Sequence, residues 1–286
     1  MRSSLNGWTE IPGPSGPATL LDKNEVVSAM REQRARTLAL FRAIPETDWE
    51  RIVVPRWRLR EVAAHLVTTD EGALTGRLLT AGFSRDGAQA VSKIEAWNDR
   101  QVSRWADRPI PELLRGLEVW AKRMERLAGV VPQGIVNRGL PTPFGRVSLA
   151  WLASMRIYDE WVHIEDVRRA YGLPSDDDRT SLRPVARQLL AGLPVQTIPR
   201  VPAGARGRVS LAMSDIDLPA LGFDLGGRRY GLGVEGSDAR ITGSVAGIAM
   251  VAARRDPWQD AETAGALKVE GDRTAAEAIL DALLLV

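Results

Sequence analysis

The sequence predicts a two-domain α+β protein, in which an up-and-down bundle of four or so helices precedes a smaller domain of mixed strands and helices. Between residues 21 and 174, apolar residues recur at helical spacing, and long helical segments alternate with loops. After residue 174, short β-type runs separated by glycines replace that pattern. We expect an irregular lead-in at residues 1–20, the helical bundle at 21–174 and the α+β domain at 175–286.

The helical domain is expected to begin with a helix in which Val26 and Met30 mark the buried face and which ends near Pro45. The segment 46–57 and the stretch 132–146, which contains two prolines and several glycines, are expected to be loops. The helices are expected at residues 21–45, 59–81, 88–105, 109–127 and 147–171.

The boundary between the domains carries a strong helix-stop signal. Gly172 and Pro174 predict the end of the preceding helix, and the acidic segment Ser175–Asp178 suits a linker that leads into the next helix. Beyond it, we expect helices at 179–192, 243–255 and 273–285, and strands at 208–213, 222–225, 229–234, 239–241 and 267–270.

Composition excludes several classes of function. The chain has no cysteine, which rules out disulfides, thiolate ligands and a cysteine nucleophile. The net charge of +2 comes with scattered arginines and gives no general case for binding nucleic acid. No run of 18 or more apolar residues predicts a membrane span, and the first residues lack the apolar stretch of a signal peptide. We therefore expect a cytoplasmic protein whose partner is a small-molecule substrate, while the sequence does not indicate an oligomeric state.

The two histidines of the chain both lie on segments that read as amphipathic helices. Asp159 stands four residues before His163 and therefore projects from the same helical face. A carboxylate and an imidazole one turn apart form half of a metal site. His65, from a facing helix, would complete three protein ligands and leave positions open for water or substrate.

Other residues near the histidines leave the ligand set open. Glu160 is three residues before His163 and is a second candidate for the carboxylate ligand, and Glu61 is four residues before His65. Each histidine has the alternative interpretation of an ordinary core or surface residue. The metal hypothesis requires the three ligand groups to lie within about 6 Å of one another, because each ligand sits roughly 2 Å from the ion. Residues that could orient a ligand imidazole are Asp70, Glu71 and Asp166.

Two segments resemble the mycothiol-dependent maleylpyruvate isomerase family. They are Trp57-x-Leu-Arg-Glu-Val-x-Ala-His65-Leu and Asp159-x-Trp161-Val-His163-x-x-Asp166-Val-Arg168-Arg-Ala-x-Gly172-x-Pro174. The resemblance implies a DinB-like four-helix bundle followed by a small domain of sterol-carrier-like type. It also implies a divalent metal, usually zinc, held by two histidines and a glutamate. His65 and His163 match those histidines, whereas the glutamate position falls on Asp159, which is one methylene shorter.

The same resemblance implies the chemistry and the cofactor, which is mycothiol or another small thiol. A thiol bound to such a metal loses its proton, and the thiolate is a strong nucleophile. It could add to an electron-poor double bond and leave after rotation, which is isomerisation, or attack a leaving-group carbon, which is thiol transfer. We therefore expect an isomerase or S-transferase that acts on a small electrophilic, anionic substrate. The family's functional arginine falls near Arg254 and Arg255, which otherwise read as solvated residues at a helix end.

Two other classes of function remain as alternatives. The chain could be a non-enzymatic binding protein for a small hydrophobic ligand, or its metal could be structural and do no chemistry. Tryptophans are interpreted as core residues rather than as part of a site. They are Trp57, Trp97, Trp105, Trp120 and Trp161.

Overall fold

The computed structural model describes residues 9–10, 23–81, 87–136, 140–142, 145–233 and 235–285. Helices and a β-sheet are both present, so the predicted mixed α+β class is confirmed. The chain forms two compact units, which we call the helical unit (21–176) and the sheet unit (1–20 with 177–286). The predicted lead-in at 1–20 lies outside the described residues, apart from strand β1, Thr9–Glu10.

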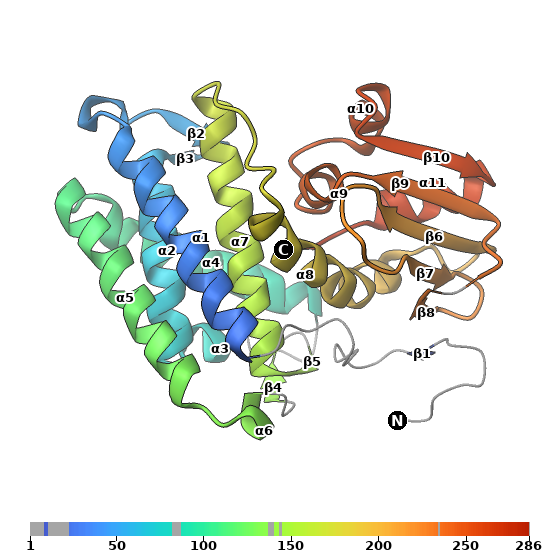
Figure 1. The fold of residues 1–286 in the computed structure, drawn as a ribbon, viewed down its shortest axis with the longest axis horizontal. Helices are drawn as coiled ribbons and strands as arrows, with labels where there is room; N and C mark the ends of the chain where they lie inside the picture. Colours follow the sequence, from blue (N-terminus) through green and yellow to red (C-terminus); the bar gives the residue numbers. More distant parts are fainter. Residues whose placement is uncertain are drawn as a thin grey trace. The chain divides into compact units, whose positions relative to one another are not determined.

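The helical unit is built from long helices whose apolar faces share one core. Helix α2 contacts α4, α5 and α7, and helix α1 contacts α5 and α7 (Figure 1). The core side chains include Phe41, Leu66, Leu117 and Ile164, which are buried and come from α1, α2, α5 and α7. No helix in the described part of the chain is long and apolar enough to cross a membrane. The long helices are α1 (Lys23–Ala43), α2 (Leu59–Leu74), α4 (Gly87–Ala106), α5 (Ile110–Val130) and α7 (Leu149–Ala170).

Glycines in the left-handed conformation set two of the helix ends. The expected helix at 59–81 is wrong, because α2 ends at Leu74 and a separate helix α3 covers Arg77–Ala81. Gly76, between them, has φ +71°, a conformation that interrupts the helix and that glycine adopts without a steric penalty. The predicted stop after α7 is confirmed, since Gly172 has φ +65° and follows the last helical residue closely.

The two segments expected to be loops contain ordered structure, so those expectations were too simple. In 46–57, a short helix η1 (Glu46–Asp48) precedes strand β2 (Ile52–Val54), which pairs antiparallel with β3 (Trp57–Arg58). The second segment contains helix α6 (Gln133–Val136) and an antiparallel pair, β4 (Leu140–Thr142) and β5 (Gly145–Val147). Strand β3 runs directly into α2, so the first hairpin fixes the position of Trp57 relative to that helix.

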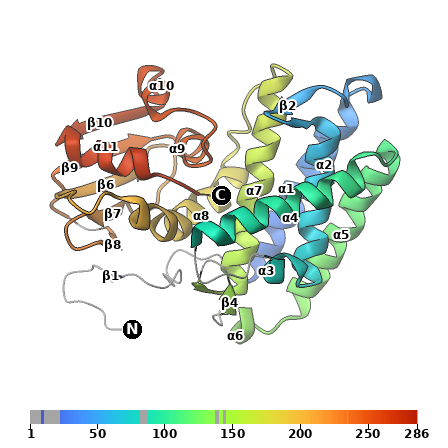
Figure 2. The same ribbon diagram turned by 180° about the vertical axis from the view of Figure 1, so that it is seen from behind.

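The sheet unit contains a six-stranded sheet in the order β1-β8-β7-β6-β9-β10 within the described residues (Figure 2). Neighbouring strands are antiparallel except β6 and β9, which are parallel. Every predicted strand is present within a few residues of its expected position. The strands beyond β1 are β6 (Arg208–Met213), β7 (Leu221–Asp224), β8 (Arg229–Leu232), β9 (Ala239–Gly243) and β10 (Leu267–Gly271).

Helices accompany this sheet, and α11 packs on β6 and β9. Helix α8 continues through Pro194 to Thr197, past the predicted end at residue 192, and is followed by a short helix η2. Its N-terminus is capped as expected, because the Asp178 side chain accepts a hydrogen bond from the backbone N–H of Thr180. Helix α10 has no counterpart among the predicted elements. The bounds are α8 (Arg179–Thr197), η2 (Ile198–Arg200), α9 (Val245–Ala252), α10 (Trp258–Thr263) and α11 (Arg273–Ala282).

A pair of glycine substitutions tests the packing of α2 on α4. A Cβ added at Gly72 would lie 2.5 Å from the Trp97 ring, whereas one added at Gly129 in α5 meets nothing within 4 Å. We expect Gly72→Ala to lower the free energy of unfolding by about 1–3 kcal/mol, because overpacking outweighs the gain in helix propensity. Gly129→Ala should leave it unchanged or raise it by up to about 1 kcal/mol. Thermal and urea unfolding of the full chain measure both, and equal effects would contradict the packing.

Candidate metal centre

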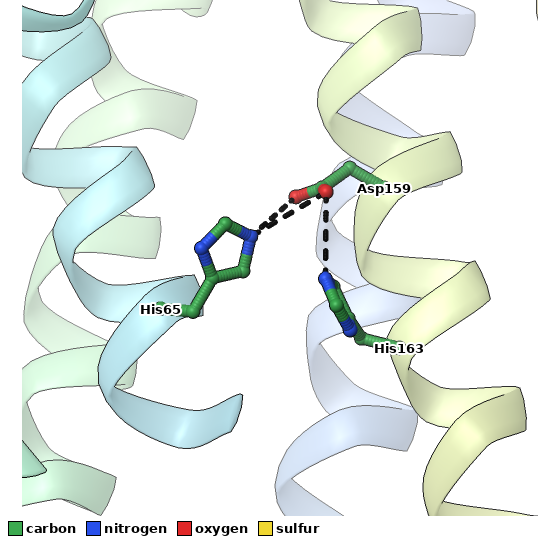
Figure 3. Close-up of side chains that lie close together, drawn as sticks. All are labelled: His65, Asp159 and His163. Atoms are coloured by element: carbon green, nitrogen blue, oxygen red, sulfur yellow. Dashed lines mark hydrogen bonds and ion pairs between the residues drawn. The ribbon is translucent and has the colours of Figure 1, made fainter. Parts of the chain in front are cut away.

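Helices α2 and α7 place His65, Asp159 and His163 together, with the three side chains pointing toward one another (Figure 3). The Nε2 atom of His65 lies 3.5 Å from Oδ1 of Asp159, and Nε2 of His163 lies 3.7 Å from the same oxygen. The three candidate ligand atoms all lie within 4.8 Å of one another. The convergence that the metal hypothesis requires is therefore present in the fold.

The spacing of these atoms can be compared with that of a metal site. Ligand atoms about 2.1 Å from a tetrahedral ion are separated by roughly 3.4 Å. The two distances to Asp159, 3.5 and 3.7 Å, are close to that value. The wider separation, of up to 4.8 Å, would close to that value if the two imidazole nitrogens approached each other by up to about 1.4 Å, through rotation of their side chains. The residues present thus fit a divalent ion with three protein ligands.

Burial and charge favour the protonation states that a metal site needs. His65 and His163 are 4% and 6% exposed, whereas the side chain of Asp159 is 31% exposed. Burial lowers the pKa of His65 below its ordinary value, although Asp159 opposes that shift, so the neutral imidazole is favoured. Burial would raise the pKa of Asp159, but the hydrogen bond with His65 and the positive charge of Arg156 lower it below its usual value. A neutral imidazole and an ionised carboxylate are the forms that coordinate a metal.

Glu160, the alternative carboxylate, is engaged elsewhere. Its two oxygens accept hydrogen bonds from Arg34, at 2.9 Å from Nε and 2.8 Å from Nη2, and the residue is 4% exposed. Among the described residues, Asp159 is the carboxylate that lies between the two imidazoles. The geometry favours Asp159 as the ligand, and this assignment stays a prediction.

The acids that could orient a ligand imidazole have different partners in the structure. Asp166 Oδ2 lies 3.3 Å from Nδ1 of His163, within ion-pair range but not aligned as a hydrogen bond. Asp70 pairs with two arginines and Glu71 with Arg104, so neither binds an imidazole. The side chain of Glu61 accepts a hydrogen bond from the backbone N–H of Arg58 at the start of α2. Asp166 is therefore the acid of this set that is placed to orient a ligand histidine.

Trp57 lines the cluster, although the sequence led us to expect a core residue. Its ring centroid lies 4.9 Å from that of His65 and 5.6 Å from that of His163, with the planes tilted by 37° and 33°. The residue is half-buried. It belongs to strand β3, so no helical spacing links it to His65, and only the hairpin that precedes α2 brings the ring to the site.

Arg254 and Arg255 follow α9 in the sheet unit. Nη2 of Arg254 donates to the backbone oxygen of Asp281 at 2.9 Å, and Nη1 of Arg255 donates to that of Ala253 at 3.1 Å. The two residues belong to a different unit from the three candidate ligands. Their role toward a substrate stays a prediction.

Residues 30–168 match the family described as the mycothiol maleylpyruvate isomerase N-terminal domain. The match assigns this part of the chain to that family. The matched region contains all three candidate ligands, His65, Asp159 and His163.

Proteins with known sequences or structures agree with this membership. Two uncharacterized proteins from strains of Mycobacterium tuberculosis are 26% identical to the chain over 181 residues, a match that spans 62% of this chain and 66% of each relative. A crystal structure of a mutant of mycothiol-dependent maleylpyruvate isomerase aligns with 87% of this chain and 93% of its own, with a TM-score of 0.56 and 15% identity. At that identity the likeness shows a shared fold.

Substitution of the ligands tests the metal centre directly. We expect the chain to be purified from zinc-supplemented medium with about one divalent ion per molecule, and His65→Ala, His163→Ala and Asp159→Asn each to abolish most of that content, because three protein ligands are the minimum here. Elemental analysis measures it. Glu71→Gln is the matched control, since this acid of α2 binds Arg104 rather than an imidazole. Full metal content in Asp159→Asn, or equal loss in the control, would exclude the assigned ligand set.

Proposed function

We propose that this protein is a divalent-metal- and thiol-dependent enzyme, an isomerase or S-transferase that acts on a small electrophilic, anionic substrate. The observation that carries the proposal is the convergence of His65, Asp159 and His163 from two helices, with the carboxylate partly exposed. The family match supports the thiol, because the descriptions of the matched domain and of the similar solved structure name mycothiol and maleylpyruvate isomerase. Zinc is the proposed ion, although two histidines and a carboxylate also suit iron(II).

The metal, when bound, supplies Lewis acidity that favours the deprotonated form of a thiol beside it. His65 and His163 would hold it as neutral ligands, and Asp159 would contribute a single negative charge. That leaves one positive charge of a divalent ion unbalanced, which suits one thiolate. The chain has no cysteine of its own, so the thiol has to come from a small cofactor. Trp57 covers the faces of both imidazoles and keeps water from that side.

The alternatives from the sequence are less well supported by this arrangement. A structural zinc site is normally closed by four protein ligands, whereas the described residues offer three at this place. An open position beside a partly exposed Asp159 is typical of a catalytic site. A hydrophobic-ligand binder would have no need of this buried triad. These points favour the enzyme over both the binder and the structural metal.

Activity measurements test the proposal. We expect the zinc-loaded protein to isomerise maleylpyruvate, or to transfer mycothiol to an electrophilic aromatic acid, only when both metal and thiol are present. Removal of the metal with a chelator should abolish turnover, and added zinc should restore it. Absorbance of the substrate and loss of free thiol are the two readouts. Turnover that persists without metal or without thiol would contradict the mechanism, as would a metal-loaded protein that leaves both substrates unchanged.

The proposed carboxylate-binding arginine has its own test. We expect either Arg254→Gln or Arg255→Gln to raise KM at least about tenfold while metal content stays constant, because a charge-assisted bidentate contact would be lost. The other of the two variants then serves as the matched control. Wild-type KM in both variants would remove these residues from the proposed site.

A further inference from the structure

Behind the metal ligands lies a closed network of four charged side chains. Arg34, Asp70, Arg156 and Glu160 come from α1, α2 and α7, and each side chain is at most 7% exposed. Arg34 reaches Asp70 and Glu160 at 2.8 Å, and Arg156 reaches Asp70 at 2.7 Å and Glu160 at 3.2 Å. Two positive and two negative charges alternate, so the network is neutral as a whole. Buried charges persist in this way when each is paired and hydrogen-bonded.

Arg156 is the member of this network that reaches the metal centre. Its Nη1 donates to Oδ2 of Asp159 at 3.3 Å, and its Nη2 donates to the backbone oxygen of Leu66, the residue after His65, at 3.4 Å. The guanidinium is rigid and planar. Its Nε donates to Asp70, and its Nη2 also lies 3.2 Å from Glu160. The guanidinium is therefore held in place while it contacts both α2 and α7, the helices that carry the ligands.

We propose that Arg156 is a positioning residue that presents Asp159 to the metal through a single oxygen. The inference rests on the metal site proposed above. Oδ2 of Asp159 accepts from Arg156 and lies 3.5 Å from Nε2 of His65, whereas Oδ1 lies 3.5 Å from Nε2 of His65 and 3.7 Å from Nε2 of His163. Arg156 therefore fixes the rotation of the carboxylate and directs Oδ1 toward the ion.

The charge of Arg156 might be expected to weaken the binding of a cation, but its surroundings argue against this. Asp70 and Glu160 both pair with it directly, so the field that Arg156 adds at the metal is largely cancelled. The effect of Arg156 that we expect at the metal is therefore the orientation of the Asp159 carboxylate. Partners that orient metal ligands typically change affinity by 10- to 100-fold when they are lost.

The chain provides a matched control for this role in Arg34. It has the same side chain, the same two acidic partners and the same burial, but none of its hydrogen bonds goes to Asp159 or to α2 beside His65. Arg156→Gln and Arg34→Gln should both lower Tm, since each leaves the two buried carboxylates with one arginine instead of two. Only the first should change the metal centre. Arg156→Lys provides a milder variant, because a lysine keeps the positive charge but cannot contact Asp70, Asp159 and Glu160 at the same time.

The experiment is titration of the metal-free proteins with Co²⁺, followed by its visible absorption bands, and zinc affinity by competition with a chelator. We expect Arg156→Gln to bind 10- to 100-fold more weakly than wild type, with shifted cobalt bands, and Arg156→Lys to be weakened less. Arg34→Gln should stay within about threefold, with wild-type bands. If Arg156→Gln does not fold, Arg156→Lys against Arg34→Lys decides in the same way.

The outcomes separate this inference from the proposed function. Equal affinities and spectra for the Arg156 and Arg34 variants, or tighter binding after loss of Arg156, would overturn the positioning role while leaving the metal site intact. A wild-type protein that binds neither Co²⁺ nor zinc would instead remove the proposed function, and with it this inference.

Discussion

The pairing of buried charges in the helical unit is the constraint on which the candidate site depends. Arg34, Asp70, Arg156 and Glu160 can be buried only while they face one another, because an unpaired charge in this core would cost several kcal/mol. Apolar packing alone tolerates small shifts between helices. A slide of α7 by one turn, about 5.4 Å, would separate Arg34 from Glu160 and Arg156 from Asp70. The charges therefore specify how α1, α2 and α7 are aligned.

The same alignment produces the metal triad. Asp70 of α2 pairs with Arg156 of α7. His65 precedes Asp70 on α2 by a little more than one turn, and it pairs with Asp159, which follows Arg156 on α7 by about one turn. An earlier residue on α2 thus pairs with a later residue on α7, which is the order expected for antiparallel helices. Once the network sets the register, the two imidazoles and the carboxylate lie within 4.8 Å of one another. The hairpin of β2 and β3 then places the Trp57 ring beside both imidazoles.

How much of this the sequence could predict depends on the range of the interactions involved. The helices and strands were recognised because periodicity, Gly172 and Asp178 act within a few residues. The choice between Asp159 and Glu160 was left open, because adjacent positions on α7 both come within reach of His163. The structure favours Asp159, because Arg34 binds Glu160 from 126 residues away. The hairpin that carries Trp57 was missed for a related reason, since strands of two or three residues show no alternation that marks them.

The shorter acid at position 159 is consistent with this arrangement. The family resemblance places a glutamate there, and a loss of reach was the natural concern. Yet Oδ1 of Asp159 already lies 3.5 and 3.7 Å from the two imidazole nitrogens, near the separation that a metal requires. A short side chain also keeps its carboxylate close to the surface of α7, where Arg156, three residues earlier on the same face, can hold the second oxygen. We therefore interpret Asp159 and the Arg156 guanidinium that binds it as one unit of the proposed site.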